Sequence, residues 1–313
     1  MTSGENKGEQ LIIEEWQRKI QSLLIKSILR VNEPMRLHTS MQVGGSADLF
    51  IEGKSEEEIL AVMRCAREED IPLFVMGRGS NLVVRDGGIR GIVLQIALDT
   101  LRVQGVSLTA AAGCKLPFVA REAMQKNLAG LEFAQGIPGS MGGAVIMNAG
   151  AYGGEIADVL RRVRYIDENL NVVEREIQPG DLGYRSSVFA ARGWTVLCAE
   201  FTLHRDTDGS ARKRFDEFRK LRNEKQPIEW PSAGSTFKRP EGYFAGKLIQ
   251  DAGLRGHQRG GAQISEKHAG FIINTGAASA ADVLGLIEEI QSKVASTSGV
   301  YLEPEVKIVG EKE

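Results

Sequence analysis

The sequence lacks the marks of several protein classes, and each absence excludes something. The first ten residues are polar and contain no apolar segment after a basic start, so no secretory signal is visible and we expect a cytoplasmic protein. The three cysteines, Cys65, Cys114 and Cys198, are odd in number and far apart, which argues against a disulfide framework and against a zinc site. The four histidines show no metal-ligand spacing, so we expect no bound metal.

The chain also lacks a charge bias. Its 39 basic and 41 acidic residues give a net charge of −2, and both signs are interspersed along the 313 residues. A protein that holds nucleic acid by bulk charge carries a strong basic excess, so we expect no nucleic-acid partner. The length suggests about two globular domains.

One long stretch has no charge at all. Residues 134–154, AQGIPGSMGGAVIMNAGAYGG, contain seven glycines among 21 residues. A membrane-spanning helix needs about 20 mostly apolar residues with an unbroken backbone, and Pro138 and the glycines break this run, so we expect no membrane span. Dense glycine leaves the main chain open to a bulky ligand, and consecutive free N–H groups suit a pyrophosphate. Tight turns between core strands are the alternative interpretation.

A second glycine-rich segment, GRGSN at residues 77–81, follows a short apolar strand. It does not complete a dinucleotide fingerprint, because Leu82 stands where the third glycine belongs. The P-loop pattern also fails, because Asp48 occupies the position of its first glycine. A Rossmann fold is therefore not supported, although main-chain N–H groups of this segment could still wrap a pyrophosphate.

The alternation of helices and strands is typical of α/β and of α+β proteins. Helical spacing is found in 11–30, in a segment opened by a capping box of Ser55 and Glu58, in 117–128, in the charged segment 211–226, and after Ser279. The last helix should bury Val283, Ile287, Ile290 and Val294. Short strands lie between these helices, the last of them in 301–310, and a loop at 206–210 suggests a domain boundary.

The glycine segments resemble those of a known fold. Residues 76–96 (MGRGSNLVVRDGGIRGIVLQI) and 136–156 (GIPGSMGGAVIMNAGAYGGEI) resemble the two flavin-binding loops of the vanillyl-alcohol-oxidase-type FAD fold. The chain as a whole resembles the UDP-N-acetylenolpyruvoylglucosamine reductase family. That resemblance runs from LHTSMQVGGSADLF through GYRSSVF, PSAGSTFKRPEGYFAGKLIQDAGLRG and AGFIIN to LEPEVKIVG, and covers nearly all of the chain after about residue 33.

The resemblance implies a domain plan and a cofactor. It implies a two-lobed FAD-binding module at 33–207, with lobes of about 33–100 and 101–207, and an α+β substrate-binding domain at 208–313. Residues 1–32 would be a helical extension. FAD would be bound without a covalent link by residues of both loops: Gly77, Arg78, Gly79, Ser80, Asn81, Leu82, Gly136, Gly139, Ser140, Gly142, Gly143, Asn148 and Gly150.

The family's activity is the NADPH-dependent reduction of an enolpyruvyl ether on a UDP-sugar, in the synthesis of peptidoglycan precursors. The resemblance implies that Arg185 neutralises the substrate carboxylate, Ser235 donates a proton and Glu305 polarises or orients the reacting group. The UDP-sugar would be held by Tyr184, Lys225, Lys238 and Arg239. Glu303 is the nearest rival of Glu305.

Two other functions stay open at this point. One is a flavin-dependent carbohydrate oxidase of the same fold, although neither glycine segment contains a histidine that would anchor the flavin covalently. The other is a non-catalytic sugar-nucleotide-binding protein. Only 50 positions separate Arg185 from Ser235, which matches the shorter branch of the family, without the tyrosine loop that folds over the substrate. We expect a monomer.

Overall fold

The computed structural model describes residues 3–312, and the chain divides into two compact units. The first unit comprises Met1–Glu33, Asp48–Arg78 and Gly91–Arg219, and the second comprises Pro34–Ala47, Gly79–Arg90 and Lys220–Glu313. Two short segments from the N-terminal third therefore belong with the C-terminal part. That a FAD-binding module ends and a substrate-binding domain begins at residue 208 stays a prediction.

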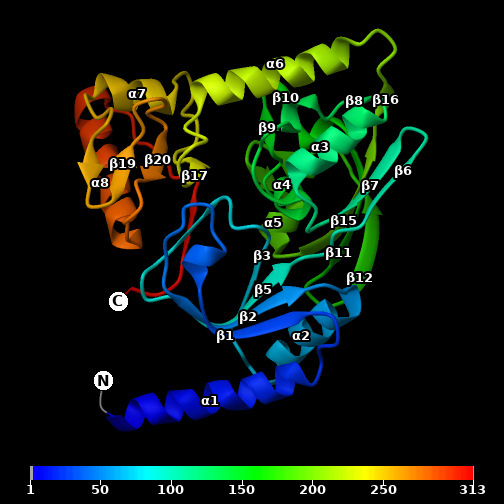
Figure 1. Ribbon diagram of the computed structural model, residues 1–313, viewed down its shortest axis with the longest axis vertical. Coiled ribbons are helices and arrows are strands. Elements are labelled where there is room, and N and C mark those ends of the chain that lie inside the picture. Colours follow the sequence, from blue (N-terminus) through cyan, green and yellow to red (C-terminus); the bar gives the residue numbers. More distant parts are fainter. Residues whose placement is uncertain (1–2, 313) are drawn as a thin grey trace. The chain divides into compact units, whose positions relative to one another are not determined.

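The first unit begins with helix α1 (Ser3–Gln21) and strand β1 (Ile28–Pro34). The sequence predicted one helix over 11–30, and this is wrong for its last part. Ile28 and Val31 are β-branched, and β1 forms the edge of a four-stranded sheet in the order β1-β2-β5-β3. The sheet also contains β2 (Ser46–Gly53), β5 (Ile89–Ile96) and β3 (Leu73–Met76), and α2 (Glu56–Glu68) lies beside it (Figure 1).

Helix α2 begins as predicted but is capped differently. The hydroxyl of Ser55 accepts a hydrogen bond from the Glu58 N–H at 3.2 Å. The buried carboxylate of Glu58 does not return to Ser55; it accepts from the N–H groups of Lys26 (2.9 Å) and Ser27 (2.7 Å). Burial raises the pKa of Glu58, but hydrogen bonds from residues 25–27 outweigh it and lower the pKa to about 2. The capping box is therefore half formed, and Glu58 ties the α1–β1 connection to α2.

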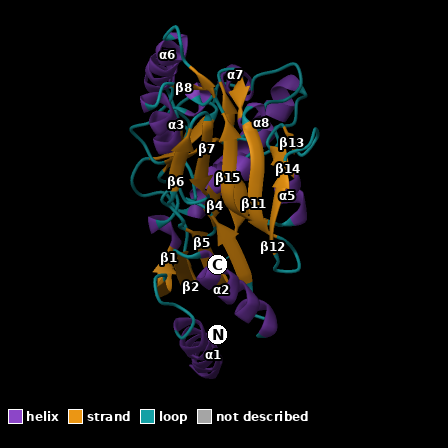
Figure 2. Cartoon of the chain, turned by 90° about the vertical axis from the view of Figure 1, so that its right-hand side faces the viewer, coloured by secondary structure: helices purple, strands orange, loops and turns teal. Residues whose placement is uncertain are grey.

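The second sheet of the first unit has five antiparallel strands in the order β12-β11-β15-β7-β6 (Figure 2). They are β12 (Val172–Glu176), β11 (Leu160–Ile166), β15 (Thr195–Thr202), β7 (Ser107–Ala111) and β6 (Leu101–Gln104). Leu108 and Phe201 are fully buried on it. Helices α3 (Leu116–Gln125), α4 (Met141–Ile146) and α5 (Val188–Arg192) complete this part.

Several short elements accompany these sheets and helices. The two-stranded pairs are β8 (Leu128–Ala129) with β16 (His204–Arg205), β9 (Gly150–Ala151) with β10 (Gly154–Glu155), and β13 (Leu182–Gly183) with β14 (Ser186–Ser187). Single 3-10 turns lie at η2 (Glu132–Ala134) and η3 (Ile156–Asp158) in the first unit and at η1 (Met35–Leu37) in the second. The charged segment forms α6 (Ser210–Lys225), as predicted.

The second unit has a four-stranded antiparallel sheet in the order β17-β20-β19-β18. Its strands are β17 (Ser232–Ser235), β20 (Phe271–Asn274), β19 (Ala262–Ile264) and β18 (Gln258–Arg259), and α7 (Ala245–Asp251) and α8 (Ala280–Ser298) accompany them (Figure 1). The predicted inner stripe of α8 is confirmed: Val283, Ile287, Ile290 and Val294 are all buried. Ser279 caps the helix as predicted.

A parallel pair closes the second unit: β4 (Leu82–Val84) lies beside β21 (Lys307–Val309). The last strand is thus shorter than predicted, because Pro304 forms only an isolated bridge with Phe237. Helices and mostly antiparallel strands in both units confirm the α+β class. From residue 3 to residue 312, no helix has the length and apolar character needed to cross a membrane.

Candidate active site

The two glycine segments meet within the first unit. A Cβ added to Gly77 would lie 2.3 Å from the Ser140 hydroxyl, so only glycine allows the end of β3 to approach the second segment this closely. The side-chain amide of Gln95 also donates to the Gly77 carbonyl at 3.0 Å. The main chain of one predicted flavin segment therefore lies against the other.

The glycines of the second segment serve close packing. A Cβ on Gly142 would lie 2.8 Å from that of Ala112, and the Gly142 N–H donates to the Ala112 carbonyl at 2.8 Å. The Gly143 N–H donates to the Ser140 hydroxyl at 3.3 Å. The expectation that consecutive N–H groups are free is therefore wrong at these two positions. Gly136 and Gly139 have φ values of +75° and +122°, which favour glycine there.

The first glycine segment continues into the second unit at Gly79. With φ +63° and its missing Cβ only 2.1 Å from the His38 carbonyl, this position accepts only glycine. Between residues 3 and 312, no protein group accepts a hydrogen bond from the N–H of Gly79 or of Ser80. Such main-chain donors, without a bulky side chain at Gly79, fit the phosphates of a dinucleotide. Whether the individual residues 77–82 contact a cofactor stays a prediction.

Arg185 lies at the tip of a tight hairpin in the first unit. Strands β13 and β14 are joined by Tyr184 and Arg185 alone, and Arg185 has φ +52°, a left-handed conformation that is costly outside glycine. Its guanidinium donates to the Gly150 carbonyl at 3.3 Å and lies 5.3 Å from the centre of the Tyr184 ring. Strain of this kind, of order 1–3 kcal/mol, is typically retained at functional positions.

Asn148 positions that hairpin. It is fully buried; its amide donates to the Gly183 carbonyl at 3.1 Å and accepts from the Ala157 N–H at 2.9 Å. The sequence predicted Asn148 as a cofactor residue, but both atoms of its side-chain amide are engaged within the protein. Asn148 therefore connects the second glycine segment to the turn that carries Arg185, and a cofactor contact from its main chain stays a prediction.

In the second unit, main-chain hydrogen bonds of Thr236, the residue after Ser235, hold Ser235 and Glu305 on neighbouring segments. Ser235 is the exposed last residue of β17, and Thr236 after it is buried. The Thr236 carbonyl accepts from the Glu305 N–H at 2.8 Å, while the Thr236 N–H donates to the Gly270 carbonyl at 2.9 Å. Two residues 70 positions apart are thus held on neighbouring backbone segments.

The first glycine segment is part of the same hydrogen-bond network. The amide of Asn81 donates to the Glu305 carbonyl at 3.1 Å, and the Asn81 carbonyl accepts from the Lys307 N–H at 2.9 Å. Ser40 donates its N–H to the Gly79 carbonyl at 3.2 Å and its hydroxyl to the Ser232 carbonyl at 2.7 Å. The sequence prediction missed Ser40 and Thr236. The only feature of the sequence that could have identified these two residues is their position in segments that resemble the family.

A histidine flanks this network. His268 accepts the Gly270 N–H on its Nδ1 at 3.1 Å, and its ring lies 5.0 Å from that of Phe271. Burial lowers the pKa of His268, so the imidazole is neutral at pH 7 with Nδ1 as an acceptor. It supports the Gly270 turn rather than supplying a positive charge.

The residues predicted to hold the UDP-sugar have different surroundings. In the first unit, Tyr184 is exposed beside Arg185. In the second, Lys225 is the exposed last residue of α6, and the Lys238 ammonium pairs with the carboxylate of Glu303. This pairing engages the rival of Glu305. The Arg239 guanidinium lies 4.0 Å from the centre of the Phe244 ring.

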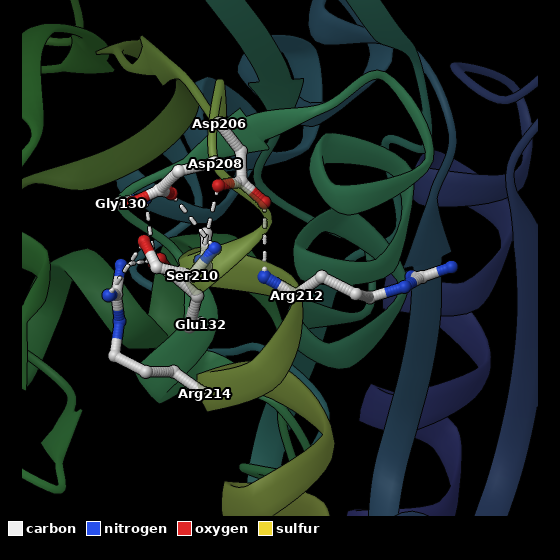
Figure 3. Close-up of polar contacts among 8 residues, drawn as sticks. Gly130, Glu132, Asp206, Asp208, Ser210, Arg212 and Arg214 are labelled. Carbon is white, nitrogen blue, oxygen red and sulfur yellow. Dashed lines mark hydrogen bonds and ion pairs between the residues drawn. The ribbon is translucent and has the colours of Figure 1, made fainter.

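The helix that ends at Lys225 is anchored to the second glycine segment at its other end. Figure 3 shows the carboxylate of Glu132 between the Gly130 N–H (2.7 Å) and the Arg214 guanidinium (2.7 Å). One turn further on, Phe218 stacks on Tyr152 with ring centres 4.6 Å apart. Contacts to Glu132 and to Tyr152 thus hold the first part of α6 within the first unit.

Comparisons with known proteins identify the parts of the chain. Residues 47–174 match the FAD binding domain family, and residues 226–309 match the family described as the UDP-N-acetylenolpyruvoylglucosamine reductase C-terminal domain. The UDP-N-acetylenolpyruvoylglucosamine reductase of Caldanaerobacter subterraneus subsp. tengcongensis is 48% identical over 94% of this chain and 98% of its own. That of Lachnoclostridium phytofermentans is 45% identical over 94% and 97%. The crystal structure of the Thermus caldophilus reductase has a TM-score of 0.76 at 33% identity, covering 91% of this chain and 99% of that one.

Proposed function

Because the chain belongs to the UDP-N-acetylenolpyruvoylglucosamine reductase family, we propose that it is an NADPH-dependent flavoprotein reductase. Its substrate would be UDP-N-acetyl-3-O-(1-carboxyvinyl)glucosamine and its product UDP-N-acetylmuramate, a peptidoglycan precursor. One observation supports this reading above the others: Glu305 and the first glycine segment share a hydrogen-bond network with Thr236, the residue that follows Ser235. A sugar-nucleotide-binding protein without catalysis would not need that arrangement.

The residues present fit FAD. The approach of Gly77 to Ser140, and the unengaged N–H groups of Gly79 and Ser80 among the described residues, leave main chain for a diphosphate. FAD, when bound, supplies hydride that it has taken from NADPH. The chain itself must place the alkene, stabilise charge and deliver a proton.

Arg185 would stabilise the charge. Reduction of the enolpyruvyl group places enolate-like negative charge on its carboxylate, and a guanidinium that is fixed beforehand lowers the energy of that state. The planar guanidinium matches a carboxylate in two hydrogen bonds. The strained turn and Asn148 support this role, because they fix the direction of the side chain before substrate arrives.

Ser235 would donate the proton to the adjacent carbon. A hydroxyl is a weak acid, but the intermediate is a strong base, and a donor within about 3 Å transfers a proton on geometry. Glu305 would orient the reacting group from the neighbouring backbone segment. The bond from the Glu305 N–H to Thr236 keeps the two in register.

The visible absorption spectrum tests this function. The purified protein should be yellow, should bleach on addition of NADPH and should recover its colour rapidly when the enolpyruvyl UDP-sugar is added. Recovery in air at the same rate without the sugar would favour the oxidase. A colourless protein, or one that NADPH does not bleach, would exclude the proposal. A preference for NADPH, a cytoplasmic location and a monomeric state belong to the proposal as well.

A further inference from the structure

Two neighbouring aromatic side chains lie exposed in the second unit, in the turn that precedes α7. Tyr243 is 48% exposed and Phe244 is 62% exposed. The turn is ordered: the Tyr243 N–H donates to the Pro240 carbonyl at 3.1 Å, Gly242 has φ +73°, and the Phe244 carbonyl accepts from the N–H groups of Lys247 and Leu248. Large apolar side chains that are held in solvent by an ordered turn indicate a binding surface.

Arg239 completes this surface. Its guanidinium carbon lies 4.0 Å from the centre of the Phe244 ring, and its Nε donates to the Tyr243 carbonyl at 3.3 Å. Because the guanidinium covers one face of the Phe244 ring, the exposed area belongs to the other face and the edges. An open aromatic face next to a fixed positive charge is the combination that holds a nucleobase together with its phosphate.

The order of side chains along the chain matches the order of groups along a UDP-sugar. Ser235 would meet the enolpyruvyl group, Arg239 would meet the diphosphate, and Tyr243 and Phe244 follow within nine residues of Ser235. We propose that Tyr243 and Phe244 form a stacking platform for the uracil base of the substrate. This inference rests on the proposed function and extends it to the distal end of the ligand.

The first unit offers a matched control. Phe118 is 37% exposed on α3, and the Arg121 guanidinium carbon lies 5.4 Å from the centre of its ring. It is thus an exposed phenylalanine with an arginine over it, outside both glycine segments and outside the catalytic network. A general effect of removing an exposed aromatic ring would appear equally at Phe118 and Phe244.

Binding of UDP to the FAD-loaded protein, measured by calorimetry, tests the platform. Phe244→Ala should raise the Kd of UDP about tenfold, because stacking of a base on an aromatic ring is of that order. The KM of the UDP-sugar should rise similarly with kcat within twofold, since Phe244 lies away from the reacting groups. Phe118→Ala should change neither constant, and Phe244→Tyr should bind UDP as the unsubstituted protein does.

A shortened substrate makes the test specific. The enolpyruvyl N-acetylglucosamine 1-phosphate has the reacting group and one phosphate but no uridine, so Phe244→Ala should leave its KM unchanged. An equal loss with both substrates, or an unchanged Kd of UDP in Phe244→Ala, would overturn the platform. Should Phe244→Ala not fold, Phe244→Leu replaces it, with the same expected losses. Failure of the proposed function looks different: the unsubstituted protein would then neither bind UDP nor reduce the UDP-sugar.

Discussion

The two units hold their candidate catalytic residues by different means. In the first unit, Arg185 is placed by side-chain hydrogen bonds and local strain, from buried Asn148 and a positive φ. In the second unit, Ser235 and Glu305 are placed by main-chain hydrogen bonds between segments far apart in sequence. Main-chain hydrogen bonds remain when most side chains are substituted, whereas the hydrogen bonds of a buried side-chain amide are lost when that residue is substituted. The second unit should therefore tolerate changes around its catalytic groups better than the first.

The largest effect is expected in the second unit, on substitution of the proposed proton donor Ser235. Ser235→Ala should slow reoxidation of the flavin by the UDP-sugar about 10²- to 10⁴-fold, because it removes a positioned proton donor. Reduction by NADPH, followed by stopped-flow absorbance, should not change. Ser232→Ala in the same strand is the control, because the Ser232 carbonyl, which this substitution keeps, is the group that accepts the hydrogen bond from Ser40. Full turnover by Ser235→Ala would remove Ser235 from the mechanism.

The second largest effect is expected in the first unit, on substitution of the buried Asn148. Asn148→Ala should lower the free energy of unfolding by about 3 kcal/mol, because Gly183 and Ala157 each lose a buried partner. The UDP-sugar reaction of the protein that still folds should also slow, because the Arg185 turn loses its support. Urea unfolding measures the first result. The exposed Asn169 provides a matched Asn→Ala control, and equal stability of the two variants would contradict this view of the first unit.

Acid should weaken the first unit through Glu58. Its pKa of about 2 lies below the ordinary value of 4.5, so its stabilisation is complete above about pH 4.5 and is lost as pH falls towards 2. Glu58→Gln should cost about 2 kcal/mol at pH 7 and flatten the dependence of unfolding free energy on pH over that window. Unfolding in urea at several pH values measures both. Glu68→Gln, at an exposed position of the same helix, should keep the full pH dependence.

The smallest effect probes a side chain within the main-chain network. Asn81→Ala removes the bond to the Glu305 carbonyl but leaves the pairing of β4 with β21, so the UDP-sugar reaction should slow only about fivefold. The Kd of FAD, measured by flavin fluorescence, separates two roles. An unchanged Kd identifies Asn81 as a residue that positions Glu305. A Kd raised as much as the rate is lowered would instead assign its side chain to the cofactor.

By itself the sequence determined much of the local structure. Helical spacing located α6 and α8, and the cap at Ser279 and the inner stripe of α8 follow from hydrogen bonding and periodicity within a few residues. The density of glycine marked both glycine segments, and the absence of charge marked the second. Long motifs in the right order were enough to identify the family.

Only the tertiary structure decided what contacts what. Strand β1 replaced the end of a predicted helix because β2 was available to pair with it, and Glu58 left its capping box for main-chain N–H groups over 30 residues away. The sequence predicts Asn148 and Asn81 as cofactor residues, and folding brings the side chain of Asn148 to the Gly183 carbonyl and that of Asn81 to the Glu305 carbonyl. The sequence does not show whether a hydrogen-bonding side chain has a cofactor or a distant carbonyl as its partner. The choice between them depends on which groups folding brings within about 3 Å.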